Sequence, residues 1–215
     1  MPPSISARWY FDLVSPYAYL HLNRLGELHP ALEITPVPVL FAGLLKHFEN
    51  KGPAELAPKR LHTYRSCVFA AQQRGIPFHL PPRHPFNPLH AQRLLIALGA
   101  PWPAITAAYD FVWGEGHDIA AEWPQFCERL GVSVEQAAAM TADPAVKQKL
   151  ADNTADAANS GVFGVPTLVF NDQNFWGSDA IDWANAYVAD PAMFDTGEMK
   201  RAAEIEIGAA RKEAG

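Results

Sequence analysis

Ser15 is the residue whose type and position most clearly suit chemistry. It follows a short apolar stretch, Trp9 to Leu13, and precedes Pro16 and a helical pattern. The first N–H groups of a helix lack partners within the helix, and the aligned peptide dipoles place a partial positive charge there. Pro16 suits the first helical position, which makes Ser15 the N-cap. The hydroxyl can help to hold an anion at this corner, or it can simply cap the helix.

A second stretch, residues 164–179, combines a strand hairpin with polar side chains. Residues 167–170 are apolar and β-branched, residues 171–174 supply turn chemistry, and Phe175-Trp176 begins a partner strand. Ser178 or Asp179 can then cap a helix that runs to about Val188. A hydroxyl and a carboxylate are therefore expected together at the end of the hairpin.

Two further strands and a helix must position Ser15. Residues 7–13 and 33–39 have the composition of strands, and residues 16–28 between them have a helical pattern with Tyr19, Leu22 and Leu25 near one face. Pro36 and Pro38 lack amide donors, which favours for the second strand either the edge of a sheet or a side where no neighbour accepts hydrogen bonds.

The middle of the chain, from about residue 53 to residue 161, has mostly helical spacing. A loop rich in proline interrupts it from Ile76 to Leu89, and Asp143-Pro144 has the residues of an N-cap and a first helical position. The apolar residues at helical spacing are Leu61, Tyr64, Val68 and Ala71, then Ala91, Leu94, Leu95 and Leu98, then Ile105, Ala108, Tyr109 and Val112. The residues from Gly197 onward suggest a terminal surface helix or a frayed end.

Composition narrows the classes of partner. The 215 residues are 49% hydrophobic with a net charge of −6 and an isoelectric point near 5.7. A sizeable core is expected, whereas nucleic acid and anionic membranes, which require a basic face, are not expected partners. With no apolar span and no leader pattern, we expect a cytoplasmic protein. Cys67 and Cys127 lie in helical patterns and are expected to remain unpaired.

The two polar stretches and the elements between them resemble one known family. A β-α-β segment, a large helical insertion and a β-β-α segment are similar to the DsbA-like branch of the thioredoxin fold, and Ser15-Pro16-Tyr17-Ala18 occupies the place of its Cys-Pro-x-Cys. The chain resembles the 2-hydroxychromene-2-carboxylate isomerases and the related kappa-class glutathione transferases. The matching motifs are Phe11-Asp12-x-x-Ser15-Pro16-Tyr17-x-Tyr19-Leu20, Gly75-Ile76-Pro77, Phe86-Asn87, Trp113-x-Glu115-Gly116-x-Asp118-Ile119, Gly164-Val165-Pro166-Thr167 and Trp176-Gly177-Ser178-Asp179.

This resemblance implies an α/β protein with a thioredoxin-like fold and an all-helical insertion. The thioredoxin-like domain would comprise residues 5–40 and 161–190, the helical domain residues 41–160, and a C-terminal helical tail residues 191–215. The resemblance also implies a cis peptide bond between Val165 and Pro166, and a homodimer.

The resemblance implies glutathione as the cofactor, with the Ser15 hydroxyl hydrogen-bonded to its sulfur. The backbone of Val165 would pair with the tripeptide in strand fashion, and Ser178 and Asp179 would hold its γ-glutamyl end. The full set of implied cofactor residues is Ser15, Asn50, Lys51, Pro53, Val165, Pro166, Trp176, Ser178 and Asp179.

The implied chemistry uses the cofactor's sulfur as a recyclable nucleophile. A thiol, whose ordinary pKa is about 8.5, ionises more readily beside a helix N-terminus and a hydroxyl donor. In the resembled isomerases, the substrate is the small aromatic acid 2-hydroxychromene-2-carboxylate and the product is trans-o-hydroxybenzylidenepyruvate. An aromatic substrate requires an apolar pocket. The candidate wall residues, which could equally be core aromatics, are Tyr17, Phe41, Phe86 and Trp113.

Three functions are compatible with these residues. The first is the glutathione-dependent isomerase, the second is a kappa-type glutathione transferase or peroxidase, and the third is a thioredoxin-like binding module without enzymatic activity. Dithiol exchange is disfavoured because Ala18 cannot resolve a mixed disulfide.

Other polar residues give weaker signals. His79, His84 and His90 are close in sequence but lack a metal-ligand spacing, so no metal is expected. Glu115 and Asp118 could be catalytic carboxylates or solvated acids at a helix end. Arg83 is a candidate for contact with a substrate carboxylate from the proline-rich loop.

Overall fold

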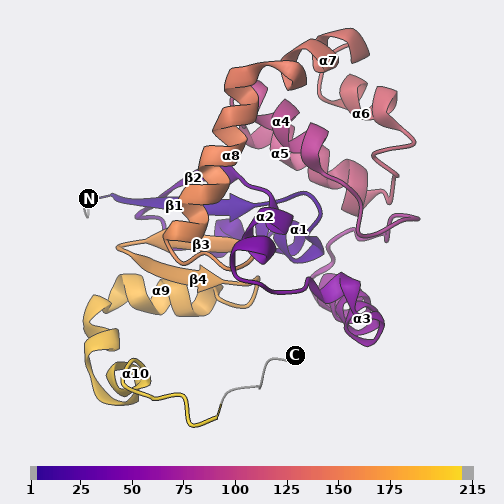
Figure 1. Cartoon of the computed structure of the whole chain (residues 1–215). Coiled ribbons are helices and arrows are strands. Elements are labelled where there is room, and N and C mark those ends of the chain that lie inside the picture. Colours follow the sequence, from indigo (N-terminus) through magenta and orange to yellow (C-terminus); the bar gives the residue numbers. More distant parts are fainter. Residues whose placement is uncertain (1–3, 210–215) are drawn as a thin grey trace.

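The computed structural model describes residues 4–209 and is built around one four-stranded sheet in the order β2-β1-β3-β4 (Figure 1). β1 is parallel to β2 and antiparallel to β3, and β3 is antiparallel to β4. The strands are β1 (Ile5–Phe11), β2 (Leu32–Pro38), β3 (Thr167–Phe170) and β4 (Gln173–Trp176). Segments from the two ends of the chain thus form one sheet, and β2 lies at its edge, as its prolines predict.

Helices cover the sheet and form a separate block above it in Figure 1. The α-helices are α1 (Pro16–Leu22), α2 (Phe41–His47), α3 (Ala57–Arg74), α4 (Leu89–Ala97), α5 (Trp102–Tyr109), α6 (Trp123–Arg129), α7 (Val134–Ala142), α8 (Pro144–Asn159), α9 (Ile181–Ala189) and α10 (Gly197–Ala202). Short 3-10 helices lie at Leu25–Glu27, Pro53–Glu55 and Pro191–Asp195, and α5 continues into a π-helix at Asp110–Gly114. No helix within residues 4–209 is both long and apolar enough to cross a bilayer.

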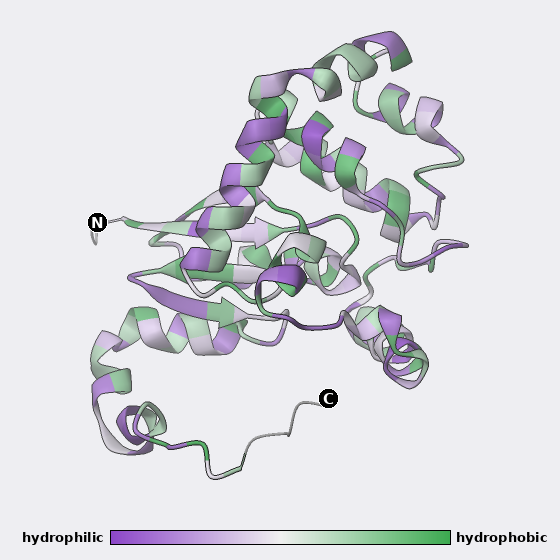
Figure 2. Ribbon diagram, viewed as in Figure 1, coloured by the Kyte–Doolittle hydropathy of each residue, from purple (hydrophilic) through white to green (hydrophobic). Residues whose placement is uncertain are grey.

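Alternation along β1 divides the core between the two faces of the sheet. Trp9 and Phe11 point into the larger core, which also contains Ile181 of α9. Tyr10 points to the opposite face and packs in a cluster with Leu44 of α2. The two-residue period of a strand produces this division. Helix α8, which also contributes to the second cluster, carries polar and apolar residues along its length (Figure 2).

One buried side chain attaches the helical block to the sheet at the end that carries Ser15. Gln92 of α4 is fully buried, and its amide Nε2 donates to the carbonyls of Phe11 (3.0 Å) and Val39 (2.8 Å). These carbonyls lie at the carboxyl ends of β1 and β2. The same side chain therefore satisfies two backbone groups where the strands stop.

The structure corrects the bounds of several predicted elements. α1 ends at Leu22 instead of residue 28, because the chain turns at Arg24, whose side chain bonds across to the carbonyl of Ser178. β1 ends at Phe11 instead of residue 13. In the hairpin, Asn171 and Asp172 form the turn with positive φ angles, and residues 173 and 174 belong to β4.

Two helix surfaces also differ from the predicted ones. The buried stripe of α3 is Thr63, Cys67 and Ala71, whereas Leu61 is 50% exposed, because only one side of α3 packs against α1. Neither Ser178 nor Asp179 caps α9, whose N-cap is Ala180. By contrast, Asp143 caps α8 by accepting from the amide of Ala145 at 2.8 Å, as predicted.

The last part of the chain forms only short helices in the structure. The 3-10 helix at Pro191–Asp195 and α10 account for its regular structure up to residue 209. The remainder of the tail predicted over residues 191–215 lies outside the described residues.

Candidate active site cleft

A cleft of about 690 Å³ opens where β1, α1, α2, α3 and the loops around β3 and β4 meet. Ser15 from one end of the chain and Asp179 from the other end both line it. The sequence-predicted residues that line the cleft are Ser15, Tyr17, Phe41, Asn50, Lys51, Pro53, Val165, Pro166, Trp176, Ser178 and Asp179. Residues up to 164 positions apart are therefore brought to one site by the pairing of β1 with β3.

Ser15 is both a helix cap and a polar group of the cleft. Its Oγ accepts from the amide of Ala18 at 3.2 Å, which is the predicted N-cap bond. The same hydroxyl donates to the carbonyl of Val165 at 3.2 Å. The peptide bond from Val165 to Pro166 is cis, as predicted. Ser15 thus contacts the loop of the second polar stretch directly, which neither stretch alone could show.

Asp12 holds the turn at Ser15 through hydrogen bonds from two backbone amides. Its carboxylate accepts from the amide of Val14 (3.0 Å, Oδ1) and from the amide of Phe41 (2.8 Å, Oδ2). The side chain is fully buried, and this burial raises the pKa of Asp12 to about 7, while the two amide donors act in the opposite direction. Asp12 therefore connects two segments by hydrogen bonds. One is the turn that contains Ser15, and the other is the start of α2, which forms the opposite wall of the cleft.

Two glycines permit the close contacts at the other end of the cleft. A Cβ on Gly164 would lie 2.7 Å from Nε1 of Trp176, so only glycine allows the indole to lie over this loop. Gly177 has a φ of +99°, and a Cβ there would lie 2.4 Å from Oδ1 of Asp179. A Cβ at either position would force the facing side chain, Trp176 or Asp179, to move, and the left-handed φ of Gly177 favours glycine there independently.

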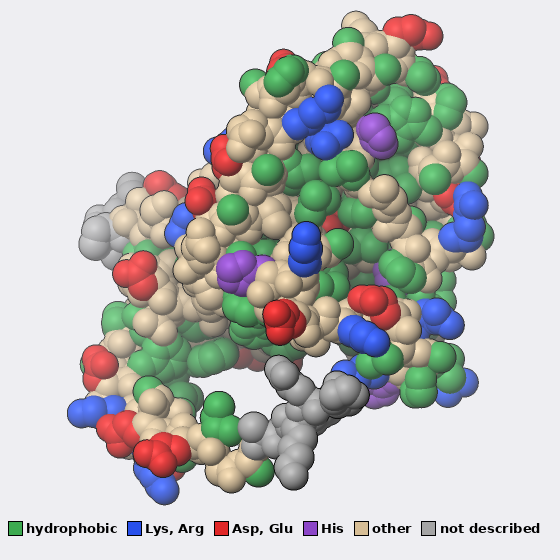
Figure 3. Space-filling view, in the orientation of Figure 1, with side chains coloured by type: hydrophobic (Ala, Val, Ile, Leu, Met, Phe, Trp, Pro, Cys, Tyr) green, Lys and Arg blue, Asp and Glu red, His purple; other side chains and the backbone are tan. Residues whose placement is uncertain are grey.

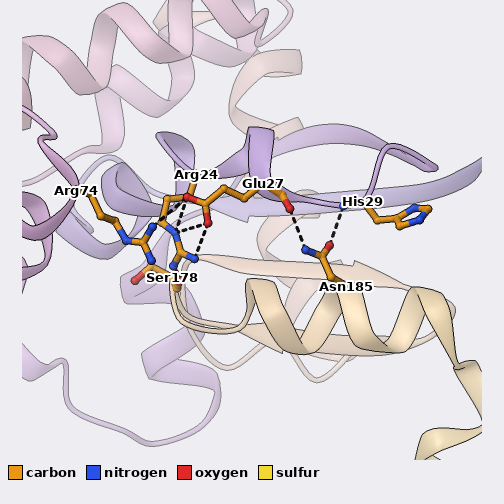
Figure 4. A network of polar contacts seen from close by, with 6 residues as sticks. All are labelled: Arg24, Glu27, His29, Arg74, Ser178 and Asn185. Carbon is orange, nitrogen blue, oxygen red and sulfur yellow. Dashed lines mark hydrogen bonds and ion pairs between the residues drawn. The ribbon is translucent and has the colours of Figure 1, made fainter.

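A network of polar side chains binds the backbone carbonyl of Ser178 (Figure 4). The guanidinium of Arg24, which is only 8% exposed, donates to the carbonyl of Ser178 and to the carboxylate of Glu27. Glu27 also accepts from Arg74 of α3 at 3.1 Å, and the hydrogen bond from Arg24, together with the charges of both arginines, lowers the pKa of Glu27. Asn185 of α9 donates to the carbonyl of Glu27 at 2.9 Å. Arg24 fixes the 177–179 loop to the turn after α1, and Glu27 in turn connects that turn to α3 and α9.

The α3 wall of the cleft contains basic residues that the sequence did not single out. Lys59 and His62 line the cleft beside Thr63 and Ser66, and the hydroxyl of Tyr17 lies 2.8 Å from Oγ of Ser66. Lys59 and His62 are spaced to lie on one turn of a helix, but this spacing matches no sequence motif. Only the packing of α3 against α1 identifies them as site residues.

His84 also lines the cleft and was missed as a site residue. Its Nε2 lies 2.8 Å from the carbonyl of Val14, and its Nδ1 lies 2.8 Å from the hydroxyl of Tyr64. Because a carbonyl can only accept, Nε2 carries a proton. Burial lowers the pKa of His84. The peptide bond from His84 to Pro85 is cis.

Two of the four predicted pocket aromatics lie outside the cleft lining. Trp113 is fully buried, and its Nε1 donates to the carbonyl of Leu13 at 2.8 Å, so the prediction that Trp113 lines the pocket is wrong. Phe86 packs against the core and is not among the lining residues. Both rings lie against His84, at centroid distances of 5.2 Å for Trp113 and 6.0 Å for Phe86. They support the cleft wall instead of forming it.

The remaining polar candidates have other partners. Nε of Arg83 forms an ion pair with Asp118 at 2.6 Å, and Arg83 is not among the residues that line the cleft. Glu115 pairs with Arg129 at 2.8 Å on the surface. Within residues 4–209, no three His, Cys, Asp or Glu side chains are arranged to hold a metal ion, and both cysteines are free and buried.

Comparisons with known proteins agree with this geometry. The DSBA-like thioredoxin domain matches residues 8–189. The chain is 27% identical to "Glutathione s-transferase kappa 2" of Caenorhabditis elegans, over 89% of this chain and 95% of the relative. It is also 27% identical to a 2-hydroxychromene-2-carboxylate isomerase of Sphingobium xenophagum, over 85% of this chain and 97% of the relative.

Among solved structures, a 2-hydroxychromene-2-carboxylate isomerase superposes with a TM-score of 0.75 at 22% identity. The match covers 94% of this chain and all of that one. The fold is therefore the DsbA-like thioredoxin fold with a helical insertion, as the sequence predicts.

Proposed function

The chain belongs to the DSBA-like thioredoxin domain family, and from this premise we propose that it is a glutathione-dependent isomerase of 2-hydroxychromene-2-carboxylate-type aromatic acids. The observation that carries the proposal is the single cleft that contains Ser15, Val165-Pro166 and Ser178-Asp179. Each of the three can bind a different part of one extended thiol tripeptide.

The polar groups along the cleft complement the charges of glutathione. Asp179 suits the γ-glutamyl ammonium group, and the hydroxyl of Ser178 suits the neighbouring carboxylate. Lys51, with Asn50 and Pro53, lies on another part of the wall and suits the glycyl carboxylate. We propose that the cysteinyl part lies between these ends, with its sulfur at Ser15.

The bond between Ser15 and Val165 suggests how the site changes when the cofactor binds. The hydroxyl of Ser15 now donates to the Val165 carbonyl. We propose that it turns to the thiolate, and that an N–H of the tripeptide takes its place at the carbonyl. Every buried polar group then keeps a partner, which avoids the cost of an unsatisfied carbonyl.

The proposed reaction leaves glutathione unchanged. The thiolate adds to a carbon of the conjugated substrate, and ring opening moves the electron pair to the ring oxygen, which takes up a proton. Rotation about the resulting carbon–carbon single bond follows. The hydroxyl on the former ring carbon then gives up its proton to form the ketone, and the electron pair released re-forms the double bond and expels the thiolate, which gives the trans isomer. The protein binds both reactants and stabilises the thiolate through Ser15.

The α3 wall is the proposed site for the substrate. Lys59 and His62 lie near Thr63 on α3, Ala70 lies about two to three turns further along the same helix, and Tyr17 and Phe41 supply aromatic surface. An aromatic carboxylate needs this combination of an apolar slot and a cation. Lys59 is therefore the proposed anchor of the substrate carboxylate.

Lys59→Gln is expected to raise KM for the aromatic substrate about 10-fold, because a charge-assisted hydrogen bond is lost. KM for glutathione should stay within about twofold, since the glutathione groups lie elsewhere in the cleft. Initial rates with each reactant varied in turn measure both constants. Lys46→Gln, on the exposed side of α2, is the control. Equal effects of both substitutions would contradict the assignment.

Asp179→Asn is expected to raise KM for glutathione about 10-fold and to leave kcat unchanged, because its contact is equal in the ground and transition states. Asp182→Asn removes an exposed carboxylate three residues away, in the first turn of α9, and should have no effect. Steady-state kinetics at saturating substrate checks both variants. A lower kcat with unchanged KM would show that Asp179 has been assigned the wrong role.

Arg24→Gln is expected to raise KM for glutathione about 5- to 10-fold with little change in kcat, because the carbonyl of Ser178 loses its charged donor and the loop is less well positioned. Arg74→Gln removes the other arginine that binds Glu27 but does not touch Ser178, so its KM should be that of the unmodified protein. If Arg74→Gln shifts KM as far as Arg24→Gln does, the effect comes from the ion pair and not from Ser178.

A spectrophotometric isomerisation assay with and without glutathione tests the proposed function. The expected result is isomerisation that requires glutathione, with no glutathione conjugate detected by mass spectrometry. The kappa transferase relative makes conjugation the second candidate function, and accumulation of a conjugate would favour it. Absence of any glutathione binding by calorimetry would favour a binding module without enzymatic activity.

A further inference from the structure

A second cavity, of about 620 Å³, lies within the helical block between α4, α7, the start of α6 and the start of α8. Ile119 and Thr141 form part of its buried floor, with Trp123 beside them. Arg93, Lys147 and His90 provide basic or titratable groups around this floor. Among residues 4–209, no residue lines both this cavity and the Ser15 cleft.

Arg93 is the residue that most strongly indicates a missing partner. Its Nε is buried and has no hydrogen-bond partner within residues 4–209, and no carboxylate pairs with its guanidinium in that part of the chain. A buried donor without a partner is costly, more so when it is charged. The terminal nitrogens of the guanidinium, which have no hydrogen-bond or ion-pair partner within residues 4–209 either, are the groups that an oxygen acceptor in the cavity could bind.

The acids nearest to the cavity in sequence are turned to other partners. Asp118 pairs with Arg83 and also accepts from the amides of Ala120 and Ala121. Glu122 bonds to His117 and to the amide of Asp118, and Asp143, which follows Ala142 of the lining, accepts from the amide of Ala145. The lining therefore includes two cations and no carboxylate, although the chain as a whole carries a net charge of −6. Figure 3 shows basic side chains and a histidine bordering hydrophobic side chains over the upper helices.

We propose that this cavity is a second binding site, for an organic anion with a planar apolar body. The carboxylate would bind to Arg93 and Lys147, and the apolar body would lie on Trp123 and Ile119. A guanidinium can bind a carboxylate in bidentate fashion, and an indole offers a flat surface to an aromatic ring. An inorganic ion would leave the apolar floor unused, and a neutral ring would leave Arg93 without its acceptor.

Binding of 2-naphthoate, followed by two-dimensional ¹H–¹⁵N NMR of the full chain, tests this site and does not depend on the Ser15 cleft. Saturable shifts are expected at residues 87–93, 119–123 and 138–147. The neutral analogue 2-naphthamide should bind at least about 10-fold more weakly, since it lacks the charge. Shifts confined to residues 14–17 and 163–179, or none up to about 5 mM ligand, would overturn the proposal.

Substitutions assign the effect to the cavity. Arg93→Gln and Lys147→Gln should each weaken binding of 2-naphthoate about 10-fold or more. Lys149→Gln, an exposed lysine of the same helix that does not line the cavity, should leave it within about twofold. Lys147 is exposed, so its replacement tests the site even if Arg93→Gln fails to fold. Equal weakening by Lys147→Gln and Lys149→Gln would show a nonspecific charge effect and overturn the proposal.

Discussion

Ser15→Ala is expected to lower the glutathione-dependent rate about 10- to 150-fold at neutral pH, while the protein stays folded and binds glutathione with little change. The loss corresponds to one hydrogen bond to a charged sulfur, worth about 1.5–3 kcal/mol. The remaining rate should rise with pH, because bulk ionisation then supplies the thiolate that the hydroxyl no longer stabilises. The pH–rate profile of the variant should therefore be shifted to higher pH than that of the unmodified protein.

Ser133→Ala provides a matched control for the capping role of Ser15. Ser133 is the N-cap of α7 and accepts from the amide of Gln136 at 3.2 Å, the same bond that Ser15 makes with Ala18. Each substitution should lower the free energy of unfolding by about 0.5–2 kcal/mol. Only Ser15→Ala should change turnover of the folded enzyme. Wild-type turnover in folded Ser15→Ala at neutral pH would return Ser15 to a purely capping role.

Asp12→Asn is expected to abolish a large pH dependence of stability. Burial raises the folded-state pKa of Asp12 to about 7, above an unfolded value of about 3.9. The folded protein thus binds more protons than the unfolded chain between these values, so the contribution of Asp12 is fully present below about pH 4. It is lost as the pH rises through about 7, at up to about 1.4 kcal/mol per pH unit, on the order of 4 kcal/mol in all.

Urea unfolding of the unmodified protein and of Asp12→Asn is measured between about pH 4 and pH 8. The difference between their free energies of unfolding, plotted against pH, gives the contribution of Asp12. The asparagine keeps one oxygen acceptor for the amides of Val14 and Phe41, so a constant loss of about 1–3 kcal/mol is also expected. Asp152→Asn, on the exposed side of α8, should leave the pH dependence unchanged. A difference between the curves that does not vary with pH would contradict the burial argument.

Local interactions allowed the sequence to determine two helix starts and the place of one strand in the sheet. The N-caps Ser15 and Asp143, with a proline after each, are satisfied by amides two or three residues away, so short-range chemistry decides them. The prolines of β2 fixed its edge position because a missing amide donor cannot be supplied by packing. The motifs around Ser15, Val165 and Ser178 also include several of the residues that line the cleft.

Only the tertiary structure decided which side chains outside these motifs belong to the cleft. It also decided which ionisable groups have a shifted pKa. Lys59 and His62 became site residues because α3 packs against α1, and Trp113 was excluded because the core encloses it. The raised pKa of Asp12 arises from burial between two backbone segments, and Arg24 meets the carbonyl of Ser178 across 154 positions of sequence. Burial and such contacts depend on groups distant in the chain, so neither residue type nor spacing could encode them locally.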